Sequence, residues 1–550
     1  MVTHDLSMPD CRGIDIQGFS IAELRDQMSK GTFSAQDLTS CYLERIRRLN
    51  GLLKAVIEVN PDAINIAKEL DDEERNGTTR GPLHGIPFLV KDNMATADKM
   101  QTTAGSSVLI GATVPEDAVV VAKLRAAGAV LLGHANLSEW AAMRSSYYSE
   151  GYSSRGGQCR NPHNLAEHAG GSSCGSAVAV AISMCAFSLG TETDGSVMFP
   201  ADRNGVVGIK PTLGSTSCQG VIPESRNFDV VGTFGKTVAD AAVALDAILT
   251  ERPPSPLESF VSRSSKSALK GTRFGLPWKR IWEAAQSEGR KKSHPQYKVL
   301  MDLVARIREA GAEVVEAADL PSAETIIPPC GWDWDYPSKQ GHPDQSEFTV
   351  VKTDFYTDLK SYLAGLAANP KNIRDLADVI AYNKSRPEEG GIPGRHGAWP
   401  TGQDQFEKSL ASGGVEDETY HAALAFVRQK SREEGIDAAL SHDSGQLDGL
   451  LVPIAADGGV ATQVAAKAGY PMIAIPVSSS DNGVPFSLGI IQTAGREDLL
   501  VKFGSAIEDL VGGRPKPGFR NIDADNWMYV GPKPEDTRKE RNSLSGCAIC

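Results

Sequence analysis

Residues 117–136, DAVVVAKLRAAGAVLLGHAN, decide the fold of this chain. The first half carries apolar side chains at helical spacing, Gly128 ends the helix, and the apolar run that follows predicts a buried strand. The same order recurs where a helical pattern at 61–76 precedes GIPFLVKDN (85–93), and again within 298–317. Helices that alternate with buried strands in this way indicate α/β architecture.

The composition of the 550-residue chain is that of an ordinary globular protein, with 41% apolar and 23% charged residues. The length by itself favours three or four domains. The net charge of −13 argues against a broad nucleic-acid surface, which would need to be basic. The nine cysteines are odd in number and mostly scattered, which favours a reducing compartment over a disulfide framework. We therefore expect a cytoplasmic protein.

Neither a leader nor a membrane span is expected from the sequence. The first residues, MVTHDLSMPDCRG, contain no basic segment followed by an apolar one, so they do not resemble a secretory leader. The longest nearly apolar stretch, residues 177–189, falls short of the roughly 20 residues that a membrane-spanning helix needs.

Residues 151–235 hold 14 of the 54 glycines of the chain, interleaved with apolar runs such as AVAVAISM. Glycine used in this way allows unusual backbone angles and a close approach of the chain to a ligand. A functional site is therefore expected in this stretch.

Three separate pieces of sequence could together activate a serine. They are Lys91 at the end of an apolar run, Ser172 in GGSSCGSA (170–177) and Ser196 in GTETDGSVMFP (190–200). A serine hydroxyl is a poor nucleophile until a base removes its proton, and a lysine can be that base when burial lowers its pKa. The three side chains could form a relay, with N–H groups of the turn before Ser196 facing a developing oxyanion.

Each piece alone also has a more ordinary interpretation. A lysine after a strand is usually a solvated charge, and a Gly/Ser-rich turn is usually a loop or a phosphate cradle. The sequence contains no G-x-S-x-G elbow, no phosphate-binding loop and no H-E-x-x-H zinc motif. A zinc hydrolase is therefore disfavoured, and we expect neither a metal nor a cofactor.

The chain resembles the amidase signature enzymes, which hydrolyse amides with a Ser–Ser–Lys triad. GGSSCGSA is similar to the Gly-Gly-Ser-Ser-x-Gly core of that family, and Ser172 precedes Ser196 by the 24 positions expected between the bridging serine and the nucleophile. Further similar blocks follow the family order: GPLHGIPFLVKDN (81–93), TTAGS (102–106), RAAGAVLLGHANLSEWA (125–141), GIKPT (208–212), KTVADAA (236–242) and AGYPMIAIPV (468–477). The resemblance covers about residues 20–515, so it predicts one large domain where length alone favours several.

The resemblance implies a fold and a set of roles. The fold is α/β, a single large amidase signature domain with a central mixed β-sheet flanked by helices on both faces. Lys91 would be the neutral general base, Ser172 the bridging serine next to a cis peptide bond, and Ser196 the nucleophile that forms an acyl-enzyme. Four backbone N–H groups would form the oxyanion hole, those of Thr193, Asp194, Gly195 and Ser196.

The chain departs from the commonest family pattern around the nucleophile. Glu192, Asp194 and Met198 stand where most members have Asp, Gly and Arg. The first two occur in a subgroup that reads Gly-Thr-Glu-Thr-Asp-Gly-Ser, so they do not argue against activity, while the effect of Met198 is left open. Cys174 is expected to be a packed thiol rather than a reactive neighbour of the site, and His134 is expected to be structural.

Asp92 follows Lys91 directly and raises the question of whether it holds the lysine charged. Successive side chains of a strand point to opposite faces, so Asp92 need not contact Lys91. We expect a structural role for this carboxylate.

Substrate specificity is expected in residues 321–450, the part of the chain that this family varies. Trp332, Trp334, Tyr336 and Trp399 could line an apolar acyl or aryl pocket, or they could simply pack at the surface.

The predicted organisation has three parts: an N-terminal extension (1–19), the amidase signature domain (20–515) and a polar C-terminal tail (516–550). The tail ends in Cys-Ala-Ile-Cys, which matches the C-a-a-X prenylation pattern at Cys547 with an atypical last residue. Prenylation would give a weak membrane association. An accidental tail and a Cys-x-x-Cys site are the alternatives.

The predicted function is hydrolysis of a non-peptide carboxylic amide to an acid and an amine or ammonia. A glutaminase-like subunit of an amidotransferase is the near alternative, and a catalytically silent binding protein on the same fold is the distant one. The expected partner is a small-molecule amide substrate, with no nucleic acid, and a homodimer is left open.

Overall fold

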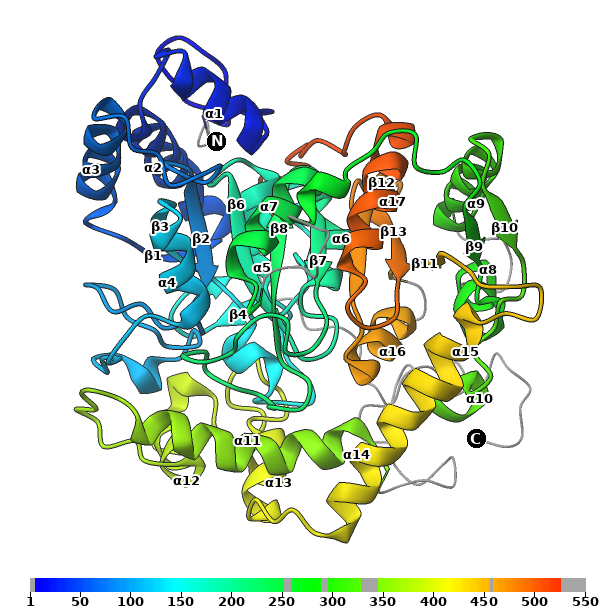
Figure 1. The fold of residues 1–550 in the computed structure, drawn as a ribbon. Helices are drawn as coiled ribbons and strands as arrows, with labels where there is room; N and C mark the ends of the chain where they lie inside the picture. Colours follow the sequence, from blue (N-terminus) through cyan, green and yellow to red (C-terminus); the bar gives the residue numbers. More distant parts are fainter. Residues whose placement is uncertain (1–4, 252–258, 288–294, 328–344, 456–458, 526–550) are drawn as a thin grey trace.

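The computed structural model describes residues 5–251, 259–287, 295–327, 345–455 and 459–525. The strands of these residues form an 11-stranded sheet in the order β1-β3-β2-β6-β8-β7-β12-β13-β11-β9-β10 (Figure 1). Their bounds are β1 (Val56–Val59), β2 (Pro87–Lys91), β3 (Val130–Ala135), β6 (Phe187–Glu192), β7 (Val207–Lys210), β8 (Val230–Gly235), β9 (Arg273–Gly275), β10 (Glu313–Val315), β11 (Gly449–Pro453), β12 (Met472–Ser479) and β13 (Pro485–Ile491). Two short strands, β4 (Tyr152–Ser153) and β5 (Gly157–Gln158), form a separate hairpin.

The sheet is mixed, as expected. Strand β2 runs parallel to both β3 and β6, whereas β12 runs antiparallel to β7 and β13. Buried parallel strands read as continuous apolar runs, and the side chains of β2, β3 and β6 are all buried.

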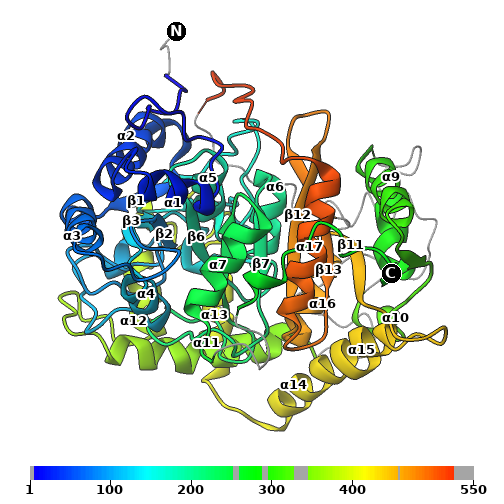
Figure 2. The same cartoon turned by 45° about the horizontal axis from the view of Figure 1, so that its top comes forward.

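Helices pack on both faces of the sheet (Figure 2). They are α1 (Ile21–Ser29), α2 (Ala35–Leu53), α3 (Ala63–Arg75), α4 (Val119–Ala126), α5 (Cys174–Ala181), α6 (Met198–Asn204), α7 (Val238–Ile248), α8 (Glu283–Ser287), α9 (Pro295–Glu309), α10 (Ala323–Ile326), α11 (Glu347–Ala364), α12 (Leu376–Lys384), α13 (Asp404–Ser412), α14 (Glu418–Ser431), α15 (Asp437–Leu440), α16 (Val460–Ala468) and α17 (Glu497–Val511).

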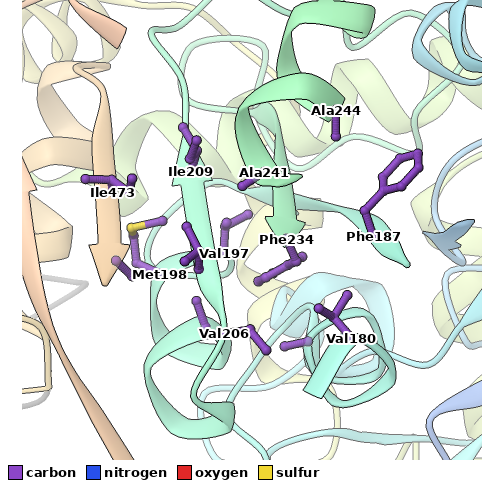
Figure 3. Packing of buried hydrophobic residues seen from close by; sticks show 14 of the residues in the cluster. Val180, Phe187, Val197, Met198, Val206, Ile209, Phe234, Ala241, Ala244 and Ile473 are labelled. Atoms are coloured by element: carbon purple, nitrogen blue, oxygen red, sulfur yellow. The ribbon is translucent and has the colours of Figure 1, made fainter. Parts of the chain in front are cut away.

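Two neighbouring residues of β8 show that the two faces are covered by different helices. Thr233 donates its hydroxyl to the carbonyl of Ala241 in α7 at 2.9 Å. Phe234 points the other way, toward Val180 of α5 (Figure 3). The expected arrangement, a central sheet with helices on both faces, is therefore confirmed.

The stretch that decides the fold has the predicted structure. Residues 119–126 are helical, Gly128 takes a φ of 80° in the left-handed region, and β3 begins at Val130. Glycine adopts this angle without the steric cost that a Cβ brings. The expected N-cap of α2 is also present, because Ser34 and Asp37 form a reciprocal capping box.

A layer of four helices, α11 to α14, lies below the sheet in Figure 1 and has an apolar core of its own. The sequence predicts helices and loops for this region, and the structure adds where they pack. Helix α11 is hydrogen-bonded to the loop that precedes β8, because Asp354 of α11 accepts hydrogen bonds from the side chains of Ser225 and Asn227 in that loop. The layer thus borders the loops of the candidate site.

Both ends of the described chain contact the domain. Arg45 donates hydrogen bonds to the carbonyls of Leu6 and Ser7. Near the other end, the carbonyl of Arg520 accepts the N–H of Leu165 at 2.9 Å. None of the helices in the described part of the chain combines the length and the apolar character that a bilayer span requires.

Candidate active site

Lys91 is the last residue of β2, and its side chain is fully buried. Its Nζ lies 2.7 Å from Ser172 Oγ, 2.8 Å from Thr191 Oγ1 and 3.2 Å from the carbonyl oxygen of Thr191. Nζ donates to all three oxygens, and a neutral amine could keep both hydrogen bonds to Thr191 while it accepts one from Ser172. Burial lowers the pKa of Lys91 to about 8, against the pull of nearby Glu224.

Ser172 joins Lys91 to Ser196. It follows a cis peptide bond, Gly171–Ser172, in the turn that leads into α5. Ser196 lies in the turn between β6 and α6, and the two serine Oγ atoms are 2.8 Å apart. The structure therefore brings the three predicted side chains into one continuous chain of hydrogen bonds. Ser196, which is 7% exposed, is the most exposed of the three side chains.

The turn from Thr193 to Ser196 holds the four N–H groups of the expected oxyanion hole. Gly195 has a φ of 77°, which lets the chain turn back toward α6. Within the described residues, no hydrogen bond engages the N–H groups of Thr193, Asp194 or Ser196. The N–H of Gly195, by contrast, is among the groups that lower the pKa of Glu192.

Glu192 anchors the first turn of α6. Its Oε2 accepts the N–H groups of Val197 and Met198 at 2.6 and 2.9 Å. Burial raises the pKa of this carboxyl, while these N–H groups partly oppose the rise. Glu192 therefore fixes the helix that follows the nucleophile, which gives a structural reason for its place in the motif.

Asp194 and Met198 occupy two other positions where the chain departs from the common pattern. Burial raises the pKa of the half-buried Asp194 to about 7, and Lys467 opposes that rise. Met198 is fully buried and packs beside Val197 near Ile473 of β12 (Figure 3). The position that carries an arginine in the common pattern thus contributes to the apolar core here.

Asp92 points away from Lys91, as the alternation of a strand predicts. Its carboxylate lies 2.7 Å from His134 Nδ1 and accepts the hydroxyl of Thr103 at 2.5 Å and the N–H of Gly105 at 2.9 Å. Asp92 and His134 are both fully buried. Asp92, which follows β2, and His134 of β3 form a buried pair, in keeping with the structural role expected for each residue.

Cys174 is a packed thiol at the start of α5. It is fully buried, and its Sγ faces the carbonyl of Gly151 at 3.9 Å.

Trp399 is buried as well, with the Arg144 guanidinium 3.6 Å from its ring centroid and Tyr152 packed edge-on. Trp399 therefore packs against Arg144 and against Tyr152 of β4. The remaining aromatic candidates, Trp332, Trp334 and Tyr336, and the prenylation candidate Cys547 lie outside the described residues.

Four residues around the serine chain are absent from the sequence prediction. Thr191 and Asn93 bond to each other at 3.0 Å beside Lys91, and Glu224 and Asp229 flank Thr193. Thr191 stands inside the GTETDGS stretch, so its proximity could have been inferred. Glu224 and Asp229 belong to no motif, and only the folding of the loop before β8 brings them to the site.

A cavity of about 300 Å³ opens beside this loop. Its lining combines apolar groups with charged ones, from Cys218, Val221, Pro223, Arg226, Asp229, Asp358, Ser361 and Tyr362. Asp229 links the cavity to Thr193 and hence to the nucleophile turn. The volume is at the lower end of that of small-molecule sites.

Comparison with known proteins gives the class of this fold and site. The family model described as Amidase matches residues 37–339. A Schizosaccharomyces pombe protein described as an amidase is 47% identical over 543 residues, which cover 95% of this chain and 90% of that protein. The crystal structure of the peptide amidase from Stenotrophomonas maltophilia has a TM-score of 0.80 at 35% identity, covering 92% of this chain and 99% of the other.

A third relative has a different described role. It is a component of the glutamyl-tRNA(Gln) amidotransferase of Acaryochloris marina, and it is 30% identical, covering 89% of this chain and 97% of that protein. These comparisons define a class of amidases, enzymes that hydrolyse carbon–nitrogen bonds. The chain belongs to the amidase family.

Proposed function

We propose that this amidase hydrolyses a small carboxylic amide by way of an acyl-enzyme on Ser196. The observation that carries the proposal is the unbroken chain from Ser196 Oγ through Ser172 Oγ to Lys91 Nζ, with steps of 2.8 and 2.7 Å. Both distances are within the range in which a proton moves along a hydrogen bond.

The first half-reaction follows from this geometry. Ser172 takes the proton of Ser196 as its own proton passes to Lys91 Nζ, and Ser196 Oγ forms a bond to the amide carbonyl carbon. The N–H groups of the turn at residues 193–196 stabilise the oxyanion. The C–N bond then breaks, and the proton returns through Ser172 to the departing amine.

In the second half-reaction a water molecule replaces the amine. The same relay removes a proton from the water, the oxygen attacks the acyl carbon, and the ester bond to Ser196 breaks. The products are a carboxylic acid and the free serine. Every proton that leaves a nucleophile is held by Lys91 until a leaving group needs it, so the cycle requires no cofactor.

The substrate class is proposed as a non-peptide carboxylic amide. The relative from Stenotrophomonas maltophilia is named a peptide amidase, so simple amides and amidated peptides belong in the same substrate screen. We place the catalytic unit at residues 20–515 and the protein in the cytoplasm. A prenyl group on Cys547 would add a weak membrane contact.

The amidotransferase alternative is supported by the likeness to the amidotransferase component from Acaryochloris marina. It differs from the amidase proposal in the fate of the amine. An isolated amidase turns over simple amides with water alone, whereas the glutaminase-like role predicts release of ammonia from glutamine coupled to a partner protein. Assay of the purified chain on both substrate types separates the two.

A fluorophosphonate probe tests the nucleophile directly. We expect the wild type to be labelled on Ser196 and to hydrolyse members of a panel of simple amides, and Ser196→Ala to do neither. Ser173→Ala is the matched control, because Ser173 lies in the same Gly/Ser turn and its Oγ bonds to the carbonyl of Thr191. Absence of labelling and turnover in the wild type would overturn the proposal.

A further inference from the structure

The hydroxyl of Thr193 lies between two carboxyl groups. Its Oγ1 is 2.6 Å from Glu224 Oε2 and 2.6 Å from Asp229 Oδ1. A hydroxyl has one hydrogen and can donate to one acceptor only, so both contacts cannot be donated by Thr193. One of the two carboxyl groups must carry a proton and donate it to the hydroxyl oxygen.

The backbone identifies the carboxyl that is ionised. Asp229 Oδ2 accepts the N–H groups of Glu224 and Ser225 at 2.8 and 3.0 Å, and Oδ1 faces Thr193. Asp229 thus acts as an acceptor at both oxygens, which is the pattern of a carboxylate. The side chain of Glu224 makes no hydrogen bond other than the one to Thr193 within the described residues. The proton therefore belongs to Glu224.

We propose that Glu224 is a positioning residue of the amidase site, which carries a proton and donates it to Thr193 while Thr193 donates to Asp229. This inference rests on the proposed function, since Thr193 begins the turn that presents the oxyanion-binding N–H groups. The chain of two hydrogen bonds fixes the side chain of Thr193 from both sides. It thereby holds the start of the turn that ends at Ser196.

The surroundings of Glu224 agree with a proton at this position. Burial raises the pKa of Glu224 to about 8 and that of Asp229 to about 6. The charged and titratable groups that influence or face Glu224 are Asp229, Asp194, Lys91, Tyr148 and Glu347. Lys91 is the one cation in this group, and it opposes the rise.

A neutral Glu224 has a second consequence, which concerns Lys91. An ionised Glu224 would favour the ammonium form of Lys91, because Glu224 is the foremost of the charges that raise the pKa of that lysine. When the proton stays on Glu224, that charge is absent, and Lys91 gives up its proton more readily to become the neutral amine that the relay needs. One proton thus supports both the oxyanion turn and the base.

A pair of amide variants tests the assignment. Glu224→Gln keeps a donor for Thr193, so we expect kcat/KM to fall by less than about fivefold. Asp229→Asn replaces one of two accepting oxygens by an NH₂ group, so it loses an acceptor for Thr193 or for the backbone, and we expect a loss of about tenfold to a hundredfold. Equal losses, or the reverse order, would overturn the proposal.

The pH profile separates this role from a merely structural one. Because Glu224 is already neutral, Glu224→Gln should leave the acid limb of kcat/KM, which reports Lys91, at its wild-type position. It should also remove the part of the alkaline limb that reports ionisation of Glu224. If Glu224 were ionised in the active enzyme, Glu224→Gln would move the acid limb to lower pH, and that result would contradict the proposal.

Two further measurements keep the test independent of folding and of activity. If Asp229→Asn does not fold, Thr193→Val replaces it as the disruptive variant, and Thr193→Ser should restore the activity that Thr193→Val loses. An infrared difference spectrum of wild type minus Glu224→Gln at neutral pH should show a carboxylic acid band. A carboxylate band in its place would refute the protonated Glu224, whereas failure of the probe to label the wild type would refute only the proposed function.

Discussion

Lys91 Nζ lies 2.7 Å from Ser172 Oγ, although 81 residues separate the two in the chain. The lysine comes from the end of a central strand and the serine from a turn before a helix. Both are buried, so the contact operates in a medium of low polarity, where a lysine gives up its charge more easily than in water. This relationship determines how the site should respond to mutation and to pH.

Removal of the base should stop acylation without unfolding the protein. Lys91→Ala is expected to lower the rate of acylation by about 10²–10⁴-fold, the range that general base catalysis contributes. Single-turnover labelling with the fluorophosphonate probe measures the effect. Lys91→Met, which fills the same volume without a base, is the matched control and should lose as much. Activity that survives both changes would refute the relay.

The activity should rise with pH across the titration of Lys91. Only the neutral amine can accept a proton, and burial lowers the pKa of Lys91 to about 8. We therefore expect kcat/KM to be low well below pH 8, where the amine is protonated, and to increase as the pH passes through that value. A profile that is flat from pH 6 to pH 9 would contradict Lys91 as the base.

Asp92→Asn should affect stability more than the pH profile. The carboxylate of Asp92 accepts hydrogen bonds from Thr103 and Gly105 and lies 2.7 Å from His134 Nδ1, and in the described part of the chain no hydrogen bond joins it to Lys91 Nζ. Loss of the buried carboxylate is expected to lower the free energy of unfolding by roughly 1–3 kcal/mol, measured by denaturant titration. If Asp92→Asn shifted the acid limb of kcat/KM and left the free energy of unfolding unchanged, Asp92 would instead act on the base.

Met198 should tolerate an apolar replacement and reject a charged one. Its side chain lies in the core between α6 and the sheet. Met198→Leu conserves volume and should cost less than about 1.5 kcal/mol. Met198→Arg, which restores the commoner family residue, should lower the free energy of unfolding by roughly 3–5 kcal/mol, because it buries a charge without a partner. An arginine variant as stable as wild type would show that a nearby acid can accommodate it.

Much of the fold could be predicted from local patterns. The apolar spacing and Gly128 in residues 117–136 predict α4 and β3, and Ser34 predicts the start of α2. These patterns succeed because the spacing of apolar side chains reports which face is buried. The order of strands in the sheet does not follow from such patterns. Strands β7 and β12, which pair with each other, are separated by more than 250 residues.

The candidate site divides in the same way. The motifs alone single out Lys91, Ser172 and Ser196, because each lies in a recognisable block of residues. Glu224 and Asp229 carry no such signal. Their contacts with Thr193 arise where the loop before β8 folds back against the nucleophile turn, so no spacing along the chain predicts them.

The sequence by itself thus determined the α/β class and the likeness to amidases, and it singled out the residues of the proposed serine–lysine relay. The tertiary structure decided what surrounds them: that Asp92 belongs with His134, that Met198 belongs to the core, and that Thr193 bridges two carboxyl groups. The physical reason is that hydrophobic periodicity and motif spacing are local properties of the chain. Proton positions and pKa values depend on burial and on charges that meet only when distant segments pack together.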